Sequence, residues 1–234
     1  MSDAAPSRID DYLDVFTSPS QLFARRSDGK FGQALLILVV ATAVLFFVTR
    51  TAMAPIWDAE MDRGMAAAAQ SNPGMTPEQI EAGKKFGGVI GGVSLIVGLP
   101  IAVLLLGAGI WLAARLIGKS LSYAQGATIA TFAMFPRVVD SVVGSVQALL
   151  MDESSLNSRY AVSLGLGRFL DPDKASPLLL ALLGRVDVFT IWITVLVVIG
   201  LKVMAKASTA QAVGASIVVW FIGAIPVLFG ALRS

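Results

Sequence analysis

Long apolar runs alternate with polar connectors along most of this chain. A membrane-spanning helix needs about 20 largely apolar residues, and five runs reach that length alone or with their flanks. We expect spans at about 31–50, 86–116, 125–151, 186–204 and 212–232. The pattern predicts an all-α membrane protein, with a cytoplasmic tail at residues 1–30 and a bundle of five transmembrane helices at 31–232.

The tail carries one helix signal just before the first span. Pro19 suits the first turn of a helix, and Leu22 and Phe23 then lie near Arg25 and Arg26. This composition is typical of an interfacial amphipathic helix, with its apolar side in the bilayer and its arginines toward phosphate. The alternative is an ordinary soluble helix ahead of the span.

Three helix starts place a capping hydroxyl before a proline. They are Ser18-Pro19, Thr76-Pro77 and Ser176-Pro177. In the first two, Gln21 and Gln79 stand where a capping box needs a glutamine.

The helix from Pro77 should run unbroken to Leu116. Such a helix would be about 60 Å long, which exceeds the hydrocarbon core of about 30 Å. Residues 58–70 are rich in good helix formers and should extend the first span in the same way. With a turn at Ser71–Gly74, the sequence predicts a helical hairpin that stands above the outer leaflet.

Short connectors indicate the orientation, because lysine and arginine are retained on the cytoplasmic side. The approach to span one and the connectors after spans two and four are basic: Arg25, Arg26, Lys30, Arg115, Lys119, Lys202 and Lys206. We therefore expect a cytoplasmic N-terminus and an outside C-terminus.

Spans one, three and five begin with similar tetrapeptides. These are Phe31-Gly32-Gln33-Ala34, Tyr123-Ala124-Gln125-Gly126 and Thr209-Ala210-Gln211-Ala212, the last two preceded by Ser122 and Ser208. Four-residue matches in alanine-rich sequence also arise by chance, so a structural repeat stays an open alternative.

Composition narrows the chemistry. Among 234 residues, 56% are hydrophobic and 15% charged, which excludes an ordinary soluble domain. The chain has no cysteine and no histidine, so it has no disulfides, no Cys or His nucleophile and no Cys- or His-ligated metal. The net charge is only +2, so nucleic acid is not an expected partner. We also expect no cofactor and no metal.

Charged residues inside span three are the main candidates for function. Arg137 and Asp140 follow Pro136, and their spacing places them on one helix face. They form either a structural ion pair or part of a path for ions, protons or lipid headgroups. Asp187 and Lys202 bracket span four and are interpreted as interfacial anchors.

Span two begins with four glycines in overlapping small-x-x-x-small patterns, which let helix backbones approach closely. They are Gly87, Gly88, Gly91 and Gly92. The contact that they favour lies either within the bundle or between protomers.

Several short elements resemble the Yip-domain (Ypt-interacting protein) membrane proteins in their bacterial form. Val15-Phe16-Thr17-Ser18-Pro19, followed by Phe23, resembles the family's element before the membrane, and Phe135-Pro136 its third span. Asp187, Phe189 and Trp192 resemble the start of its fourth span, and Gly200 the close of that span.

The resemblance implies a membrane domain of five helices with a cytoplasmic N-terminus, and it brings no catalytic residues. Eukaryotic relatives act in vesicle traffic and contact small GTPases through a cytosolic N-terminal region. Here that tail has only about thirty residues, which departs from those relatives.

These observations favour a non-enzymatic protein of the bacterial cytoplasmic (inner) membrane that organises membrane or partner proteins. Its expected partners are the lipid bilayer and either a second copy or other membrane proteins. The alternative is a small transporter, channel or lipid-moving protein that uses Arg137 and Asp140.

Overall fold

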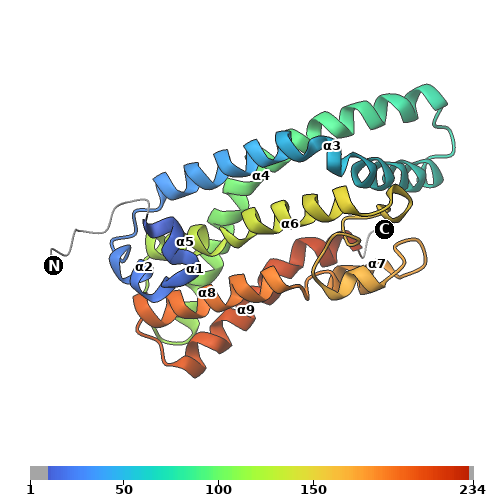
Figure 1. Cartoon of the computed structure of the whole chain (residues 1–234). Coiled ribbons are helices and arrows are strands. Elements are labelled where there is room, and N and C mark those ends of the chain that lie inside the picture. The colour runs from blue at the N-terminus through green and yellow to red at the C-terminus, as the bar shows by residue number, and fades with distance from the viewer. Residues whose placement is uncertain (1–9, 232–234) are drawn as a thin grey trace. The chain divides into compact units, whose positions relative to one another are not determined.

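The computed structural model describes residues 10–231, apart from the side chains of residues 89 and 95. In this range every regular secondary-structure element is a helix (Figure 1), as the hydrophobic pattern predicts. The α-helices are α1 (Asp10–Thr17), α2 (Pro19–Arg25), α3 (Gly32–Ser71), α4 (Pro77–Leu116), α5 (Tyr123–Ala133), α6 (Pro136–Leu150), α7 (Pro177–Leu183), α8 (Val188–Met204) and α9 (Thr209–Ala231). Two short 3₁₀ helices, η1 (Glu153–Ser155) and η2 (Leu166–Phe169), come between α6 and α7 in the chain. The ends of the predicted tail and bundle, residues 1–9 and 232, lie outside the described range.

Four helical segments in the described range are long and apolar enough to cross a membrane. They are Gly32–Ser71, Ile96–Leu116, Tyr123–Leu150 and Thr209–Ala231. The span expected at 186–204 corresponds to α8, which has 17 residues and stands at the lower limit of about 17–25 residues for a spanning helix. A membrane protein with four candidate spans is thus confirmed, and a fifth crossing by α8 stays a prediction.

The third expected span, over 125–151, consists of two helices in the structure, α5 and α6, which together make up the candidate span Tyr123–Leu150. α5 ends at Ala133 and α6 begins at Pro136. Proline lacks an amide hydrogen, and its ring would collide with the carbonyl four residues earlier, here that of Phe132. The chain therefore makes a turn and starts a new helix with Pro136 in its first turn.

The helices of the α3–α4 hairpin have the extent that the sequence predicts, and the position of the hairpin above the outer leaflet stays a prediction. α3 continues to Ser71, and α4 runs unbroken from Pro77 to Leu116. Methionines of α3 fill the space above glycines of α4: a Cβ added to Gly87 would lie 2.7 Å from the terminal methyl of Met61. The two helices therefore pack closely along this stretch.

All three proline-led helix starts are present, but their caps differ. The Thr76 amide donates to Gln79 Oε1 at 3.0 Å, and the Gln79 amide donates to Thr76 Oγ1 at 3.3 Å, which confirms that capping box. Ser176 Oγ accepts from the Leu179 amide. The side chain of Ser18 makes no capping hydrogen bond, so the box predicted with Gln21 was wrong.

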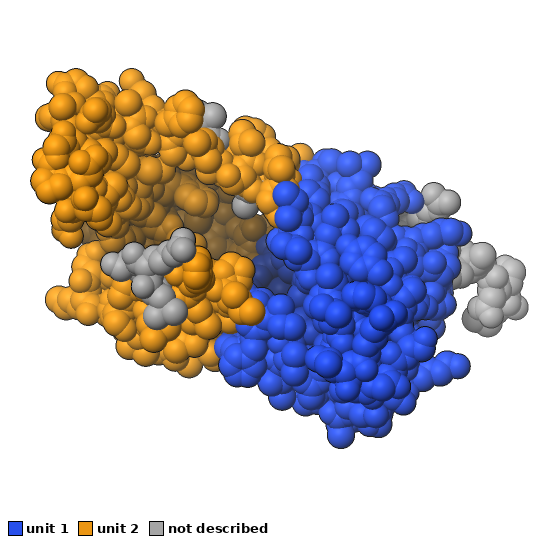
Figure 2. Space-filling view, turned by 180° about the vertical axis from the view of Figure 1, so that it is seen from behind, with its two compact units in different colours: residues 1–40, 100–137, 189–223 blue, residues 41–99, 138–188, 224–234 orange. Residues whose placement is uncertain are grey.

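The chain divides into two compact units, which Figure 2 distinguishes by colour. Unit 1 contains residues 1–40, 100–137 and 189–223. Unit 2 contains residues 41–99, 138–188 and 224–234. Each unit is described below by itself.

In unit 1, α1 and α2 form a helical pair with a buried apolar side. Val15, Leu22 and Phe23 are each 0% exposed. Leu22 and Phe23 are therefore packed against protein, which corrects the expectation that α2 turns them toward the bilayer interface. The sequence pattern did not predict α1 at all.

A buried carboxylate joins α1 to α2. Asp11 is 3% exposed and accepts hydrogen bonds from Arg25 Nη2 at 2.9 Å and Arg26 Nε at 2.6 Å. Asp14 accepts a further bond from Arg25. These arginines thus bind aspartates of the same chain, and this corrects the expectation that they point to lipid phosphate.

Two of the three similar tetrapeptides share a capping box. In α5, Ser122 Oγ accepts from the Gln125 amide at 3.1 Å and the Ser122 amide donates to Gln125 Oε1 at 2.9 Å. In α9, Ser208 and Gln211 form the same pair of bonds at 3.3 and 3.0 Å. The repeat therefore has a local structural cause in these two helices.

The same glutamines tie the connectors of unit 1 together. Gln125 Nε2 donates to the carbonyl of Ser27 before α3, at 2.8 Å. Gln211 Nε2 donates to the carbonyl of Ile117 after α4, at 3.5 Å. The starts of α3 and α5 are therefore neighbours, as are the start of α9 and the end of α4.

Candidate functional site

Arg137 lies near the start of α6 and reaches α8. Its Nη2 donates to Thr190 Oγ1 at 2.6 Å. Thr190 is 6% exposed, whereas Arg137 is half-buried. The sequence could not supply this partner, because Arg137 and Thr190 lie on helices that are far apart in the chain.

This contact gives Arg137 a structural role in joining α6 to α8. An arginine inside a span is costly unless it has hydrogen-bond partners, and a hydroxyl at 2.6 Å is one such partner. The expected pairing of Arg137 with Asp140 stays a prediction. Pro136 is buried at the first position of α6 and fixes the start of the helix that carries both charges.

The family-like elements of unit 1 meet in space. Phe16, just before Pro19, packs edge-on against Trp192 with ring centroids 5.4 Å apart, and Trp192 stacks on Phe189 at 6.5 Å. Phe23 in α2 and Phe189 in α8 are both buried. Trp192 thus joins α1 to α8 through aromatic contacts with Phe16 and Phe189.

The other residues of the fourth-span motif are also structural. Asp187 is 5% exposed, so it is packed inside the protein, and its interpretation as an interfacial anchor stays a prediction. Its backbone forms an isolated antiparallel bridge with Gly165 inside unit 2. Gly200 packs on α5, because a Cβ there would lie 2.7 Å from Ile129.

The four glycines of span two divide into two pairs. Gly87 meets Met61, and a Cβ on Gly92 would lie 3.3 Å from Phe46, so both face α3 within the bundle. Gly88 and Gly91 have no atom within 4 Å of an added Cβ. Contacts within the bundle are thus confirmed for one pair, and contacts between protomers stay a prediction for the other.

A second polar cluster lies in unit 2, around a pocket of 170 Å³ that we name the Glu60–Arg159 pocket. Its lining combines charged, hydroxyl and apolar side chains: Glu60, Arg63, Ser158, Arg159, Tyr160, Pro172 and Leu180. α3 supplies the first two, the loop after η1 and the segment leading to α7 supply most of the others, and α7 supplies Leu180.

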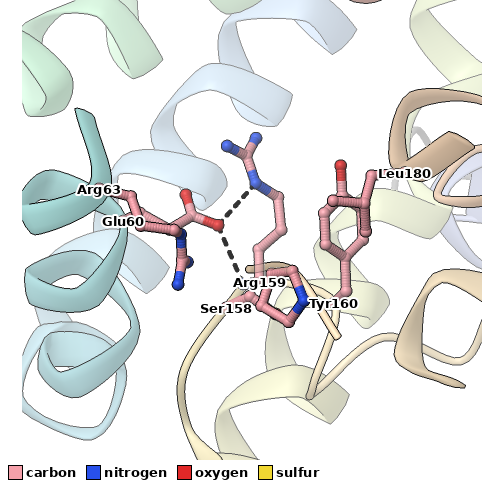
Figure 3. Close-up of a pocket in the computed structure, with 7 residues that line it drawn as sticks. Glu60, Arg63, Ser158, Arg159, Tyr160 and Leu180 are labelled. Carbon is pink, nitrogen blue, oxygen red and sulfur yellow. Dashed lines mark hydrogen bonds and ion pairs between the residues drawn. The ribbon is translucent and has the colours of Figure 1, made fainter. Parts of the chain in front are cut away.

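One carboxylate oxygen orients the central arginine. Glu60 Oε1 accepts from the backbone amide of Arg159 at 3.0 Å and from its Nε at 2.8 Å. Figure 3 shows the Arg159 side chain extended between Glu60 and Tyr160. Desolvation alone would lower the pKa of Arg159, but attraction to Glu60 outweighs it and raises the pKa above its ordinary value. Arg159 therefore stays charged.

Further contacts fix the loop that carries Arg159. Arg63 Nη2 donates to the carbonyl of Asn157 at 2.6 Å. On either side of Arg159, Leu156 and Val162 are buried in a cluster with Ile56 of α3. The pocket is thus built on a loop that is anchored at both flanks.

Sequence reasoning did not find this pocket. Glu60 and Arg159 are 99 residues apart, and neither belongs to a recognisable motif. Residues 58–70 showed only the composition of a helix, and nothing in them pointed to a polar site. A cluster assembled from separate connectors needs the tertiary fold to become visible.

Comparison with known proteins identifies the family. Residues 13–230 match the Yip1 domain. No curated protein and no solved structure matches the chain. The matched region runs from within α1 to within α9 and includes all four candidate membrane spans at least in part. This multi-pass membrane protein therefore belongs to the Yip1 domain family.

Proposed function

We propose that the chain is a non-enzymatic integral membrane protein of the Yip type that organises membrane or partner proteins. The Yip1 domain match over residues 13–230 carries this proposal, because it takes in the membrane helices themselves. The family-like residues support it, because Trp192 contacts both Phe16 and Phe189 and so joins α1 to α8.

We propose five crossings, with α8 as the fourth, a cytoplasmic N-terminus and an outside C-terminus. The bonds from Gln125 to Ser27 and from Gln211 to Ile117 favour this arrangement, because they bring together connectors that five crossings place on one side. The basic residues of those connectors favour the cytoplasm for that side. The proposed location is the cytoplasmic (inner) membrane of a bacterium.

The proposed partners are the lipid bilayer and either a second copy or other membrane proteins. Gly88 and Gly91 support a helix partner, since their open faces would let another backbone approach. Crosslinking in native membranes tests this: defined adducts are expected for the natural chain, and fewer for Gly88→Leu. Monomer alone with several crosslinkers would contradict the organising role.

One observation favours a second candidate, a transporter or lipid-moving protein. Arg137 is a charged residue inside a candidate span. Purified protein in liposomes would be assayed for ion leak and for scrambling of fluorescent lipid, beside the Arg137→Ala, Asp140→Asn double variant. Activity that is lost in the variant would establish this candidate. No activity in either protein would leave Arg137 as a structural residue.

A further inference from the structure

We propose that the Glu60–Arg159 pocket binds the headgroup of a phospholipid that carries both a phosphate and a primary ammonium, as phosphatidylethanolamine does. This goes beyond the organising role and does not depend on it. The argument uses the position of the pocket along α3, the donors and acceptors in it, its size and its apolar surroundings.

The pocket lies where the apolar part of α3 ends. Trp57 is followed by Asp58, Glu60, Asp62 and Arg63, after a segment with Arg50 as its only charge since Gly32. Tryptophan is enriched at the level of lipid headgroups. If the segment that crosses the bilayer and its interface extends to Trp57, rather than ending at residue 50, Glu60 one turn beyond Trp57 places the pocket at the height of the headgroup layer.

Arg159 supplies the phosphate-binding end. Its Nε and backbone amide are held by Glu60, and 70% of its side chain is exposed. The guanidinium is thus fixed in direction while its outer edge, away from Glu60, stays open to a ligand. Figure 3 shows the Tyr160 hydroxyl on the same side as this edge. A planar guanidinium held in place beside a hydroxyl donor suits a phosphate diester.

Glu60 supplies the ammonium-binding end. Both hydrogen bonds from Arg159 go to Oε1, which within the described part of the chain leaves Oε2 to accept from a ligand. The formal charges also balance, because Arg63 pairs with Asp173 at 3.6 Å. Two arginines and two carboxylates give no net charge, which matches a zwitterion better than an anion.

Size and surroundings favour a headgroup on a lipid. The 170 Å³ pocket has room for about five or six water molecules at about 30 Å³ each, which is the scale of a small headgroup and not of a whole lipid. α7, which contributes Leu180, exposes Leu178, Leu179 and Leu182, and Phe169 in the preceding 3₁₀ helix is 78% exposed. A polar pocket beside an exposed apolar surface suits an amphiphile, whose chains would cover these leucines.

Native mass spectrometry of the full-length protein tests the proposal. The purified protein would be incubated with equimolar phosphatidylethanolamine, phosphatidylcholine and phosphatidylglycerol of identical chains. We expect phosphatidylethanolamine to be retained about tenfold more than either competitor. A factor of this size is what one or two additional charge-assisted hydrogen bonds to its ammonium group would give. The choline headgroup has no N–H group to donate to Glu60, and the glycerol headgroup has no positive charge. Equal retention of the three lipids would overturn the proposal.

Variants assign the site. Arg159→Gln should abolish the preference, whereas Arg168→Gln, which changes an exposed arginine outside the pocket, should preserve it. Glu60→Gln keeps the shape and a carbonyl for Arg159 but leaves a positive site, so the preference should move to phosphatidylglycerol. A change of preference in Glu60→Gln requires a folded protein, so it assigns the site even if Arg159→Gln fails to fold. An unchanged preference in both pocket variants would overturn the assignment.

A separate arm distinguishes a lipid from a free phosphate. Inorganic phosphate at millimolar concentration should leave lipid retention unchanged, because it lacks the ammonium and the apolar contacts. Displacement of the lipid by inorganic phosphate alone would replace the lipid proposal with a free-phosphate site.

Discussion

Phe16 in α1 meets Trp192 in α8 edge-on, with ring centroids 5.4 Å apart and an angle of 78° between the rings. One residue precedes the first span and the other follows the start of α8, and both belong to the sequence elements that resemble the family. Tyr12, one turn before Phe16, packs on Phe135 at 5.3 Å. The N-terminal helices are therefore an integral part of unit 1.

Loss of the Phe16 ring should destabilise unit 1. Phe16→Ala removes a half-buried ring and its edge-to-face contact, so we expect a loss of about 2 kcal/mol in the free energy of unfolding. Reversible unfolding in mixed micelles, followed by tryptophan fluorescence, measures it. Leu13→Ala, at a residue 63% exposed on the same helix, should change the value by less than about 0.5 kcal/mol.

Neutralising Asp11 should also be costly. Asp11→Asn leaves Arg25 and Arg26 without their shared charge, and since both arginines are partly exposed we expect a loss of about 2–3 kcal/mol rather than the full cost of a buried pair. The same unfolding experiment applies. Glu81→Gln is the control, because its pair with Lys85 is exposed. Equal effects of the two substitutions would show that Asp11 is not a buried anchor.

The two capping serines should differ in how much stability is lost when each is replaced by alanine. Ser122→Ala removes an acceptor for the Gln125 amide and should cost about 1 kcal/mol. Ser18→Ala should cost markedly less, because the Ser18 side chain makes no capping bond. Thermal unfolding of the two variants under identical conditions decides between them, and a larger loss at Ser18 would contradict the geometry.

In α4 the glycine whose added Cβ would meet the backbone of another helix is Gly107, which is not one of the glycines that the sequence pattern marked. A Cβ on Gly107 would lie 2.7 Å from the Ala127 Cα, whereas one on Gly88 meets nothing within 4 Å. Backbone cannot move aside easily, so Gly107→Ala should cost more than about 2 kcal/mol. Gly88→Ala should stabilise α4 by up to about 1 kcal/mol. The order of the two unfolding midpoints is the test.

The hairpin could be predicted because its signals are local. Ser71, Asn72, Pro73 and Gly74 end one helix, and Thr76 with Pro77 starts the next, so no distant contact is needed. The capping boxes at Ser122 and Ser208 are equally local, and their sequence similarity was visible before their cause was.

The remaining features depend on residues that only the fold brings together. Asp11 looks like a solvated acid in the sequence, but Arg25 and Arg26 bury it. Arg137 binds Thr190 on α8, a partner that its spacing along its own helix could not indicate. The Glu60–Arg159 pocket joins a helix to a loop, and no spacing rule in the sequence connects them.

Cysteine accessibility across α8 tests the central claim of five crossings most directly. The chain has no cysteine, so Ser154→Cys before α8 and Ala210→Cys after it can be labelled without background, beside Asn72→Cys and Ser120→Cys as references. We predict that a membrane-impermeant maleimide labels positions 72 and 154 from outside intact cells. Positions 120 and 210 should react only after permeabilisation. Labelling of positions 154 and 210 from the same side would contradict the crossing by α8 and the five-helix arrangement built on it.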